Sequence, residues 1–228
     1  MSRKKKVINL IKRFFLEYKF VNSIMGNKYG FDKYRNKGAY HWAEIKENRF
    51  YINKAELIKK EIQKIEKPEV IDLGCGDGAV TNFVSCHCQI IVGIDADATA
   101  IKLARDLTNA NNVNFHTATM TSYLKRTENK KKYDLIFSLD VIEHLPNPLE
   151  IFEFSTQLLK PGGTLIIGTP LFINSALMSK YHWKEFTVLE LRDMISKFCR
   201  TYDEVLLPEQ RDDGKIYEDN YYFAICKM

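Results

Sequence analysis

The sequence lacks an apolar run long enough to cross a membrane. No stretch approaches the roughly 20 uninterrupted apolar residues that a spanning helix needs. Cysteines are also few. Their number, five, is odd, and the C-x-C pair of Cys86 and Cys88 has no second pair at zinc-ribbon spacing. The pattern predicts neither a disulfide framework nor a structural zinc site, and it favours free thiols in a reducing cytoplasm.

The sequence has no large excess of charge of one sign either. Its 228 residues carry a net charge of +5, with 45% hydrophobic and 28% charged residues. These proportions exclude disordered and collagen-like classes, and the length allows one α/β domain with additional elements. The mild positive charge is compatible with an anionic substrate, and it does not by itself indicate a nucleic acid partner.

The first residues predict a basic amphipathic helix. Val7, Leu10, Phe14 and Tyr18 recur at helical spacing among lysines and arginines. Such a helix either packs on the domain with its lysines in water, or makes peripheral contact with an acidic membrane surface. Both interpretations stay open.

An aromatic-rich segment comes next, before a long helix that is predicted over residues 43–66, with a break near Asn53, and is ended by Pro68. The segment either closes over a site or forms core between helices and sheet. We therefore divide the chain into a helical extension at residues 1–67, acting as a substrate cap, and a main domain at residues 68–228. The candidate substrate contacts in the extension are Tyr29, Tyr40, His41 and Trp42.

In the main domain, short apolar runs alternate with helical patterns. Strands are predicted at residues 69–73, 89–94, 113–116, 133–138 and 164–168, and helices at residues 79–85, 98–109 and 149–159. Such alternation predicts a parallel sheet covered on both faces. Two late runs, at residues 204–207 and 221–226, predict a terminal hairpin. The expected fold is α/β, a doubly wound and mostly parallel sheet.

A glycine-rich turn follows the first predicted strand directly. Residues 74–78 read Gly-Cys-Gly-Asp-Gly and open a helix, so the backbone can approach a ligand closely. A nucleotide-dependent dehydrogenase would share this turn. However, Asp72 before the turn would repel a pyrophosphate and attract a cationic amino group. Asp95, about 20 residues after the glycines, stands where an acid binds ribose hydroxyls.

From residue 69 to about residue 195, the chain resembles the class I S-adenosylmethionine-dependent methyltransferases. The matching segments are VIDLGCGDG at 70–78, GIDAD at 93–97, YDLIFS at 133–138, EHLPNP at 143–148 and LLKPGGTL at 158–165. Each segment is common alone, but five in this order, each on the expected strand or turn, are specific. The resemblance implies a Rossmann-like sheet of seven strands with an antiparallel last strand, and S-adenosyl-L-methionine as cofactor.

The resemblance also implies which residues bind the cofactor. They are Asp72, Gly74, Cys75, Gly76, Asp95, Ala96, Thr119, Met120 and Asp140. The chain departs from the family at residues 117–121, where no acid is present to bind the adenine amino group. Thr119 can accept one hydrogen bond there, and Met120 can lie on the adenine face.

A second cluster follows the fourth predicted strand, where open α/β sheets bind ligands. The resemblance places the methyl donor near Asp140 and the acceptor near Glu143 and His144. We predict His144 as a catalytic residue; alternatively, Glu143 and His144 organise the loop before the next helix. The ubiquinone-type O-methyltransferases are similar here and associate such a cluster with a divalent metal. We predict no metal site.

Residues 169–186 are too irregular for a helix and too long for a simple turn, which predicts an active-site lid. A capping box of Thr187 and Glu190 then starts a helix. The lid contains a His-x-x-Glu-Phe-Thr pattern that resembles methyltransferases encoded with polysaccharide and small-molecule pathways. We predict His182 as a base or substrate contact and Glu185 as a substrate contact.

We therefore expect a methyltransferase that acts, by O-methylation, on a small or sugar-linked acceptor, including nucleotide-activated or phosphorylated ones. A quinone-type or lipid O-methyltransferase at a membrane surface is the alternative, as is a non-catalytic subunit that binds the cofactor. The Asn/Asp-Pro-Pro-Tyr sequence of base N-methylation is absent, and no separate nucleic-acid module is present, so a nucleic acid acceptor is not favoured.

Overall fold

The computed structural model describes residues 33–126, 133–179, 181–210 and 214–228. In this part of the chain, seven strands form one sheet with the order β3-β2-β1-β4-β5-β7-β6. The strands are β1 (Glu69–Leu73), β2 (Ile90–Asp95), β3 (Val113–Thr117), β4 (Tyr133–Leu139), β5 (Leu159–Pro170), β6 (Thr201–Gln210) and β7 (Ile216–Lys227). The helices are α2 (Lys33–Lys37), α3 (His41–Glu47), α4 (Arg49–Ile62), α5 (Ala79–Val84), α6 (Ala98–Leu107), α7 (Met120–Arg126), α8 (Glu150–Leu158) and α9 (Val188–Ser196), with short 3-10 helices η1 (Ser85–His87) and η2 (Ile142–His144).

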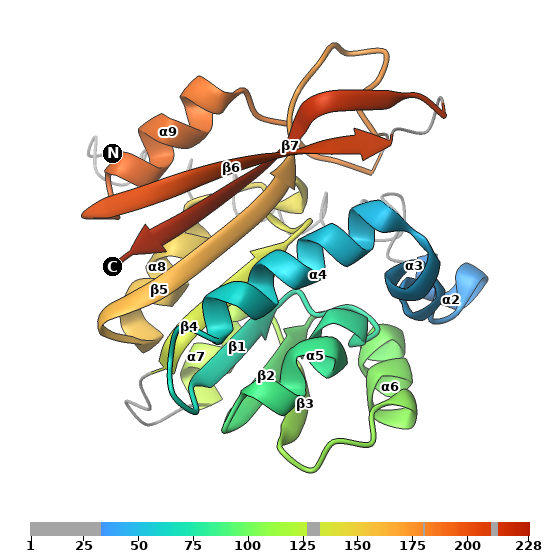
Figure 1. Cartoon of the computed structure of the whole chain (residues 1–228), viewed down its shortest axis with the longest axis vertical. Coiled ribbons are helices and arrows are strands. Elements are labelled where there is room, and N and C mark those ends of the chain that lie inside the picture. The colour runs from blue at the N-terminus through green and yellow to red at the C-terminus, as the bar shows by residue number, and fades with distance from the viewer. Residues whose placement is uncertain (1–32, 127–132, 180, 211–213) are drawn as a thin grey trace, which may run out of the picture.

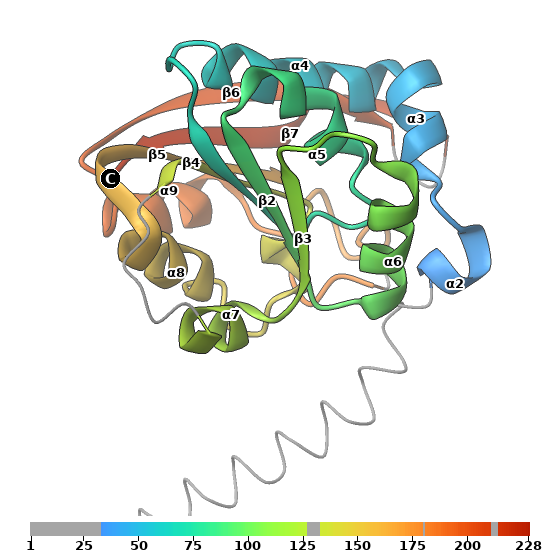
Figure 2. The same cartoon turned by 90° about the horizontal axis from the view of Figure 1, so that it is seen from below.

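Helices cover both faces of the sheet (Figures 1 and 2), as the alternating pattern predicts. On one face, Ile58 and Ile62 of α4 and Val84 of α5 pack against apolar residues of the sheet. On the other face, α8 and α9 contribute residues such as Phe152 and Leu191 to a larger core. This arrangement buries both surfaces of the central strands, which explains their continuous apolar runs.

The terminal hairpin is confirmed and is longer than predicted. β7 runs antiparallel to both β5 and β6, and the strands from β1 to β5 pair in parallel. The doubly wound, mostly parallel sheet with an antiparallel last strand, β7, is therefore the fold that the sequence predicted.

The break that was predicted near Asn53, in the helix over residues 43–66, is misplaced. The chain forms two helices that meet at Asn48, whereas Asn53 lies inside α4. Asn48 has extended backbone angles (φ −95°, ψ 112°), and its side chain accepts a hydrogen bond from the backbone N–H of Phe50. An asparagine that caps α4 in this way ends the preceding helix.

The capping box at the start of α9 is confirmed. The Thr187 side chain accepts from the backbone N–H of Glu190, and the Glu190 carboxylate accepts from the backbone N–H of Thr187. Phe186, just before the cap, and Leu191 are both buried in the same core. The segment between β5 and α9 is thus fixed at its far end.

Two predictions lie outside the described residues. These are the basic helix at residues 7–18 and the substrate contact Tyr29. Among the described helices, none combines the length and the apolar character of a membrane span.

Candidate active site

The glycine turn between β1 and α5 is shaped by three glycines with left-handed backbone angles. Gly74, Gly76 and Gly78 have φ values of 78°, 53° and 77°. A Cβ on Gly74 would lie 2.2 Å from a methyl group of Val141, and one on Gly76 would lie 2.0 Å from the Tyr34 hydroxyl. The glycines therefore allow two neighbouring segments to approach the turn, in addition to exposing its backbone.

Asp95 supports this turn from the end of β2. Its carboxylate accepts the backbone N–H of Gly76 at 2.9 Å and the backbone N–H of Asp97 at 2.8 Å, through different oxygens. Burial raises the pKa of Asp95, and these backbone hydrogen bonds counteract part of the effect. A carboxylate offers about four acceptor positions. Both oxygens can therefore still accept from the two hydroxyls of a ribose.

Asp72 lies beside the turn, inside β1, and is 3% exposed. Its carboxylate accepts the Thr81 hydroxyl at 2.5 Å. Burial raises the pKa of Asp72 to about 7, although the Thr81 hydrogen bond acts in the opposite direction. A cationic ligand would stabilise the ionised form of this carboxylate, so Asp72 fits the predicted contact with an amino group.

The raised pKa of Asp72 has a consequence for stability. Because the folded-state pKa exceeds the unfolded value of about 4, the stability that the protonated carboxyl contributes is complete below pH 4 and is lost as the pH rises to about 7. We expect Asp72→Asn, which keeps an acceptor for Thr81, to remove this loss. Without cofactor, urea unfolding should show that wild type loses up to about 4 kcal/mol relative to the variant between pH 4 and pH 8. A difference that stays constant over this range would contradict the assignment.

A cavity of about 650 Å³ opens at the carboxyl ends of the strands. Its lining includes most of the predicted site residues. These are Tyr40, His41, Asp72, Gly74, Cys75, Gly76, Asp95, Ala96, Thr119, Met120, Asp140, Glu143, His144 and His182. Residues at the carboxyl ends of four neighbouring strands line the cavity. Because these strands are ordered β3-β2-β1-β4 in the sheet, the spatial order of the residues is Thr119, Asp95, Gly74 and Asp140. This order suits an elongated ligand with adenine near β3, ribose at β2 and a methionine part at β1 and β4.

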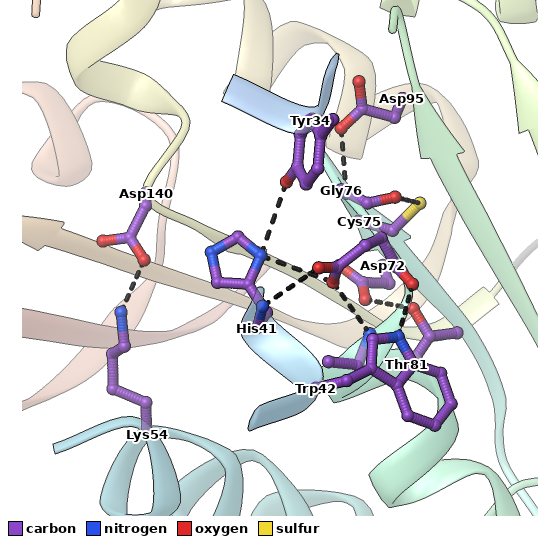
Figure 3. Close-up of polar contacts among 12 residues, drawn as sticks. Tyr34, His41, Trp42, Lys54, Asp72, Cys75, Gly76, Thr81, Asp95 and Asp140 are labelled. Carbon is purple, nitrogen blue, oxygen red and sulfur yellow. Dashed lines mark hydrogen bonds and ion pairs between the residues drawn. The ribbon is translucent and has the colours of Figure 1, made fainter. Parts of the chain in front are cut away.

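Trp42 and Glu185 lie outside the cavity lining and support residues that belong to it. The Trp42 indole N–H donates to the backbone carbonyl of Asp77 at 2.8 Å, and the His41 backbone N–H donates to the Asp77 carboxylate at 3.0 Å (Figure 3). Helix α3 is thereby attached to the glycine turn. Glu185 is buried, and its carboxylate lies 2.7 Å from Nδ1 of His182.

The predicted acceptor cluster contacts the segment between β5 and α9. Nδ1 of His144 lies 2.9 Å from the carbonyl oxygen of Tyr181, which can only accept, so Nδ1 carries the proton. Burial lowers the pKa of His144 to about 4, with a smaller contribution from His182. His144 is therefore neutral at pH 7, and its Nε2 is available as an acceptor.

Glu143 is completely buried next to these histidines. One of its carboxylate oxygens accepts the Thr169 hydroxyl at 2.9 Å, and the other, also buried, has no hydrogen-bond partner among the described residues. Burial and the nearby Asp140 charge raise the pKa of Glu143. Ligand atoms of Glu143, His144 and His182 all lie within 4.8 Å of one another, so this group could hold a metal ion. The metal-binding cluster considered from the sequence consisted of Asp140, Glu143 and His144. In the structure, Asp140 is instead paired with Lys54, and His182 joins the other two residues.

Lys54 and Tyr51 line the cavity and were missed by sequence reasoning, whereas Tyr34, which also lines it, belongs to the aromatic segment that was expected to close over a site. A signal for Lys54 is present in the sequence, because it stands at helical spacing within the buried apolar stripe that includes Phe50 and Ile58. A lysine in such a stripe indicates a buried charge that needs a partner. For Tyr51, no local pattern in the sequence shows that its ring lines the cavity.

The sequence model of the methyltransferase-domain family matches residues 43–202. The chain therefore belongs to this family of methyltransferase domains. The resemblance to class I S-adenosylmethionine-dependent methyltransferases is confirmed, and with it the cofactor class.

Among curated relatives, the chain is 26% identical over 155 residues to a ubiquinone biosynthesis O-methyltransferase of Hydrogenovibrio crunogenus, covering 67% of this chain and 62% of that protein. It is 34% identical over 105 residues to the same-named protein of Glaesserella parasuis, covering 44% of each. The matches thus span less than two thirds of these relatives.

The fold also resembles that of solved methyltransferases. The N-methyltransferase NodS of Bradyrhizobium japonicum, in complex with S-adenosylhomocysteine, has a TM-score of 0.65 at 17% identity, covering 81% of this chain and 90% of that chain. A putative methyltransferase in a complex with the Haloferax volcanii Trm112 activator has a TM-score of 0.64 at 14% identity, covering 86% and 96%.

Proposed function

We propose that this chain transfers the methyl group of S-adenosylmethionine to a hydroxyl oxygen of a small aromatic acceptor of the quinone-biosynthesis kind. The observation that carries the proposal is the lining of the cavity, which includes the rings of Tyr40, Phe50 and Tyr51 together with those of His144 and His182. Flat rings favour a flat aromatic ligand. The relatives named ubiquinone biosynthesis O-methyltransferases support the same acceptor class.

The residues of the chain act mainly by positioning in this proposal. When bound, the cofactor supplies an electrophilic methyl group on a sulfonium. Asp95 and the glycine turn hold the adenosyl part, and Asp72 holds the amino group. The lid and α3 hold the acceptor and exclude water, which supplies much of the rate enhancement of an in-line displacement.

The sugar-linked or phosphorylated acceptor expected from the sequence is the second candidate. Lys33 of α2 lines the cavity, and its ammonium lies 4.9 Å from the ring centre of Tyr181 in the lid. A cation in this position could bind a phosphate group. We propose that α2 and α3 form the part of the cap that selects between these acceptors.

The test is methyl transfer from radiolabelled S-adenosylmethionine to a panel of acceptors. Catechol and a prenylated catechol represent the aromatic class, and nucleotide sugars and their free sugars represent the second class. We expect labelled product with the catechols. Transfer only to the sugars would favour the second candidate, and S-adenosylhomocysteine binding without any transfer would favour a non-catalytic subunit.

We expect His144→Ala to slow methyl transfer by about 10- to 100-fold and to leave S-adenosylhomocysteine affinity unchanged. The reason is that His144 lines the cavity, and Nε2 of its neutral imidazole can accept a hydrogen bond that orients the hydroxyl. Steady-state kinetics and isothermal titration calorimetry measure the two effects. His87→Ala, outside the cavity, serves as the control. Wild-type turnover of His144→Ala would remove this residue from the site.

A further inference from the structure

Lys54 is a charged residue inside the buried face of α4. It is 3% exposed, and α4 packs this face on the sheet through Ala55, Ile58 and Ile62. Burying an ammonium is unfavourable unless a specific environment compensates the lost hydration. The surroundings of Lys54 supply such an environment, which indicates a defined role for this side chain.

Three aromatic rings and one carboxylate surround the ammonium. Nζ lies 4.5 Å from the ring centres of Phe50 and Tyr51 and 4.6 Å from that of Tyr221. It donates a hydrogen bond to Asp140 at 2.5 Å (Figure 3). Cation–π contacts and a charge-assisted hydrogen bond restrict the ammonium to one position. The Lys54–Asp140 pair therefore has a defined geometry, to which α4 and the residue after β4, far apart in the sequence, both contribute.

The two partners differ in their access to the cavity. The Lys54 side chain is 4% exposed, whereas the Asp140 side chain is 40% exposed and lines the cavity. Asp140 follows β4 directly and has a left-handed φ of 55°, a conformation that few residues other than glycine adopt. Its backbone N–H is bound to the carbonyl oxygen of Gly168. The carboxylate thus lines the cavity, and its Oδ2 accepts the hydrogen bond from Lys54.

The pairing also limits what Asp140 can bind. Lys54 already compensates its negative charge, so a second cation, such as the amino group of the cofactor, gains little there. Among the described residues, no lysine pairs with Asp72, which remains the better partner for the amino group. Oδ1 of Asp140, in contrast, is free of the contact with Lys54 and can accept a hydrogen bond from a neutral hydroxyl group.

We propose that Asp140 is the group that accepts the proton of the acceptor hydroxyl, and that Lys54 is the positioning residue that holds Asp140 charged and oriented for this step. The inference rests on the proposed function and specifies which side chain activates the acceptor.

The step balances in atoms and charge. The acceptor O–H bond breaks and its proton goes to Oδ1 of Asp140, while a lone pair of the acceptor oxygen forms the new bond to the methyl carbon. The carbon–sulfur bond breaks, and its electron pair stays on sulfur. One positive sulfonium and one negative carboxylate become a neutral thioether and a neutral carboxylic acid.

The neighbouring charged groups keep the Asp140 carboxylate ionised. Burial would raise the pKa of Asp140, but the charge and hydrogen bond of Lys54 outweigh it and hold the pKa below its ordinary value. Burial instead raises the pKa of Glu143 and lowers that of His144 to about 4. The titratable and charged groups that face or influence Asp140 are Tyr40, His41, Tyr51, Lys54, Glu143, His144 and Tyr221.

The first test is a double-mutant cycle with catechol as the acceptor. We expect Lys54→Met and Asp140→Asn each to lower kcat by about 100-fold or more, since general-base catalysis contributes at least this much. The double variant should lose no more than Asp140→Asn alone, within about twofold. Lys54→Arg, which keeps a cation, should retain more activity than Lys54→Met. Additive losses in the double variant, or loss of S-adenosylhomocysteine affinity in Lys54→Met, would overturn the proposal.

The cycle remains informative if Lys54→Met does not fold because it leaves the Asp140 carboxylate without its partner. The double variant removes both charges, and the comparison of Asp140→Asn with the double variant then decides whether Lys54 has any effect of its own. The matched control is Lys60→Met, an exposed lysine of the same helix, which should behave as wild type.

The second test does not depend on turnover and separates this inference from the proposed acceptor. Carbon-13 NMR of aspartate carboxyls in the complex with S-adenosylhomocysteine follows the titration of Asp140, assigned with Asp140→Asn. We expect Asp140 to titrate below its ordinary pKa in wild type and in Lys54→Arg, which keeps the cation, and at a higher pH in Lys54→Met. The same titration of Asp140 in wild type and in Lys54→Met would overturn the proposal, even if catechol proves to be no substrate. If catechol is not methylated but the titration shifts, the acceptor assignment fails and the Lys54–Asp140 relation stands.

Discussion

Replacing Asp95 with alanine should weaken S-adenosylhomocysteine binding by about 100- to 10,000-fold. The carboxylate is placed to accept from two ribose hydroxyls, and hydrogen bonds to a charged group contribute about 1.5–3 kcal/mol each. Two of them amount to about 3–6 kcal/mol, which corresponds to this range of affinity. Isothermal titration calorimetry on the folded variant measures the effect directly.

The same substitution removes the acceptor for the backbone N–H groups of Gly76 and Asp97. The glycine turn should therefore become less ordered, which adds to the loss of affinity. Asp106→Ala is the matched control, because Asp106 is an exposed aspartate of α6 whose partner is Lys102. It changes the net charge equally and should leave affinity unchanged. If Asp95→Ala binds S-adenosylhomocysteine as wild type does, the cofactor does not lie along this edge of the sheet.

Gly74→Ala should both destabilise the fold and weaken cofactor binding by at least tenfold. The added Cβ would lie 2.2 Å from a methyl group of Val141, a β-branched side chain with little freedom to move. Overpacking of this kind costs about 1–3 kcal/mol. Relief of the contact would displace Val141 and with it the neighbouring Asp140, or would distort the turn that faces the cofactor. Urea unfolding and calorimetry with S-adenosylhomocysteine measure the two effects.

Gly162 provides a control that isolates the steric effect. Its φ of 77° is nearly the same as the 78° of Gly74, but no atom lies within 4 Å of a Cβ built on it. Gly162→Ala should therefore show only the cost of a left-handed residue, about 1–2 kcal/mol, with normal cofactor affinity. Equal losses of stability in the two variants would mean that Val141 moves away without cost.

The parts of the fold that were predicted correctly depend on local patterns. The strand β1 and the glycine turn could be predicted because a short apolar run followed by three glycines has few other structures available. The start of α9 could be predicted from Thr187 and Glu190, whose reciprocal hydrogen bonds involve neighbours in the chain. The break at Asn48 was misplaced because Asn53 is an equally plausible cap by residue type, and packing of α4 on the sheet selects between them.

The predicted site residues came together for a topological reason. Parallel strands end at one edge of a sheet, so residues that follow β1, β2, β3 and β4 line one cavity. Their individual partners could not be predicted in the same way. Trp42 belonged to the predicted substrate contacts, yet its indole N–H binds the backbone of Asp77.

The sequence by itself determined the order of strands and helices, the glycine turn, the two acids beside it and the family, because each depends on residues that are close in the chain. Only the tertiary structure decided that Lys54 pairs with Asp140, 86 positions away, and that His182 joins Glu143 and His144. Such contacts depend on how helices and lid pack on the sheet, and the free energy of that packing is shared among many residues whose pairing no local pattern specifies.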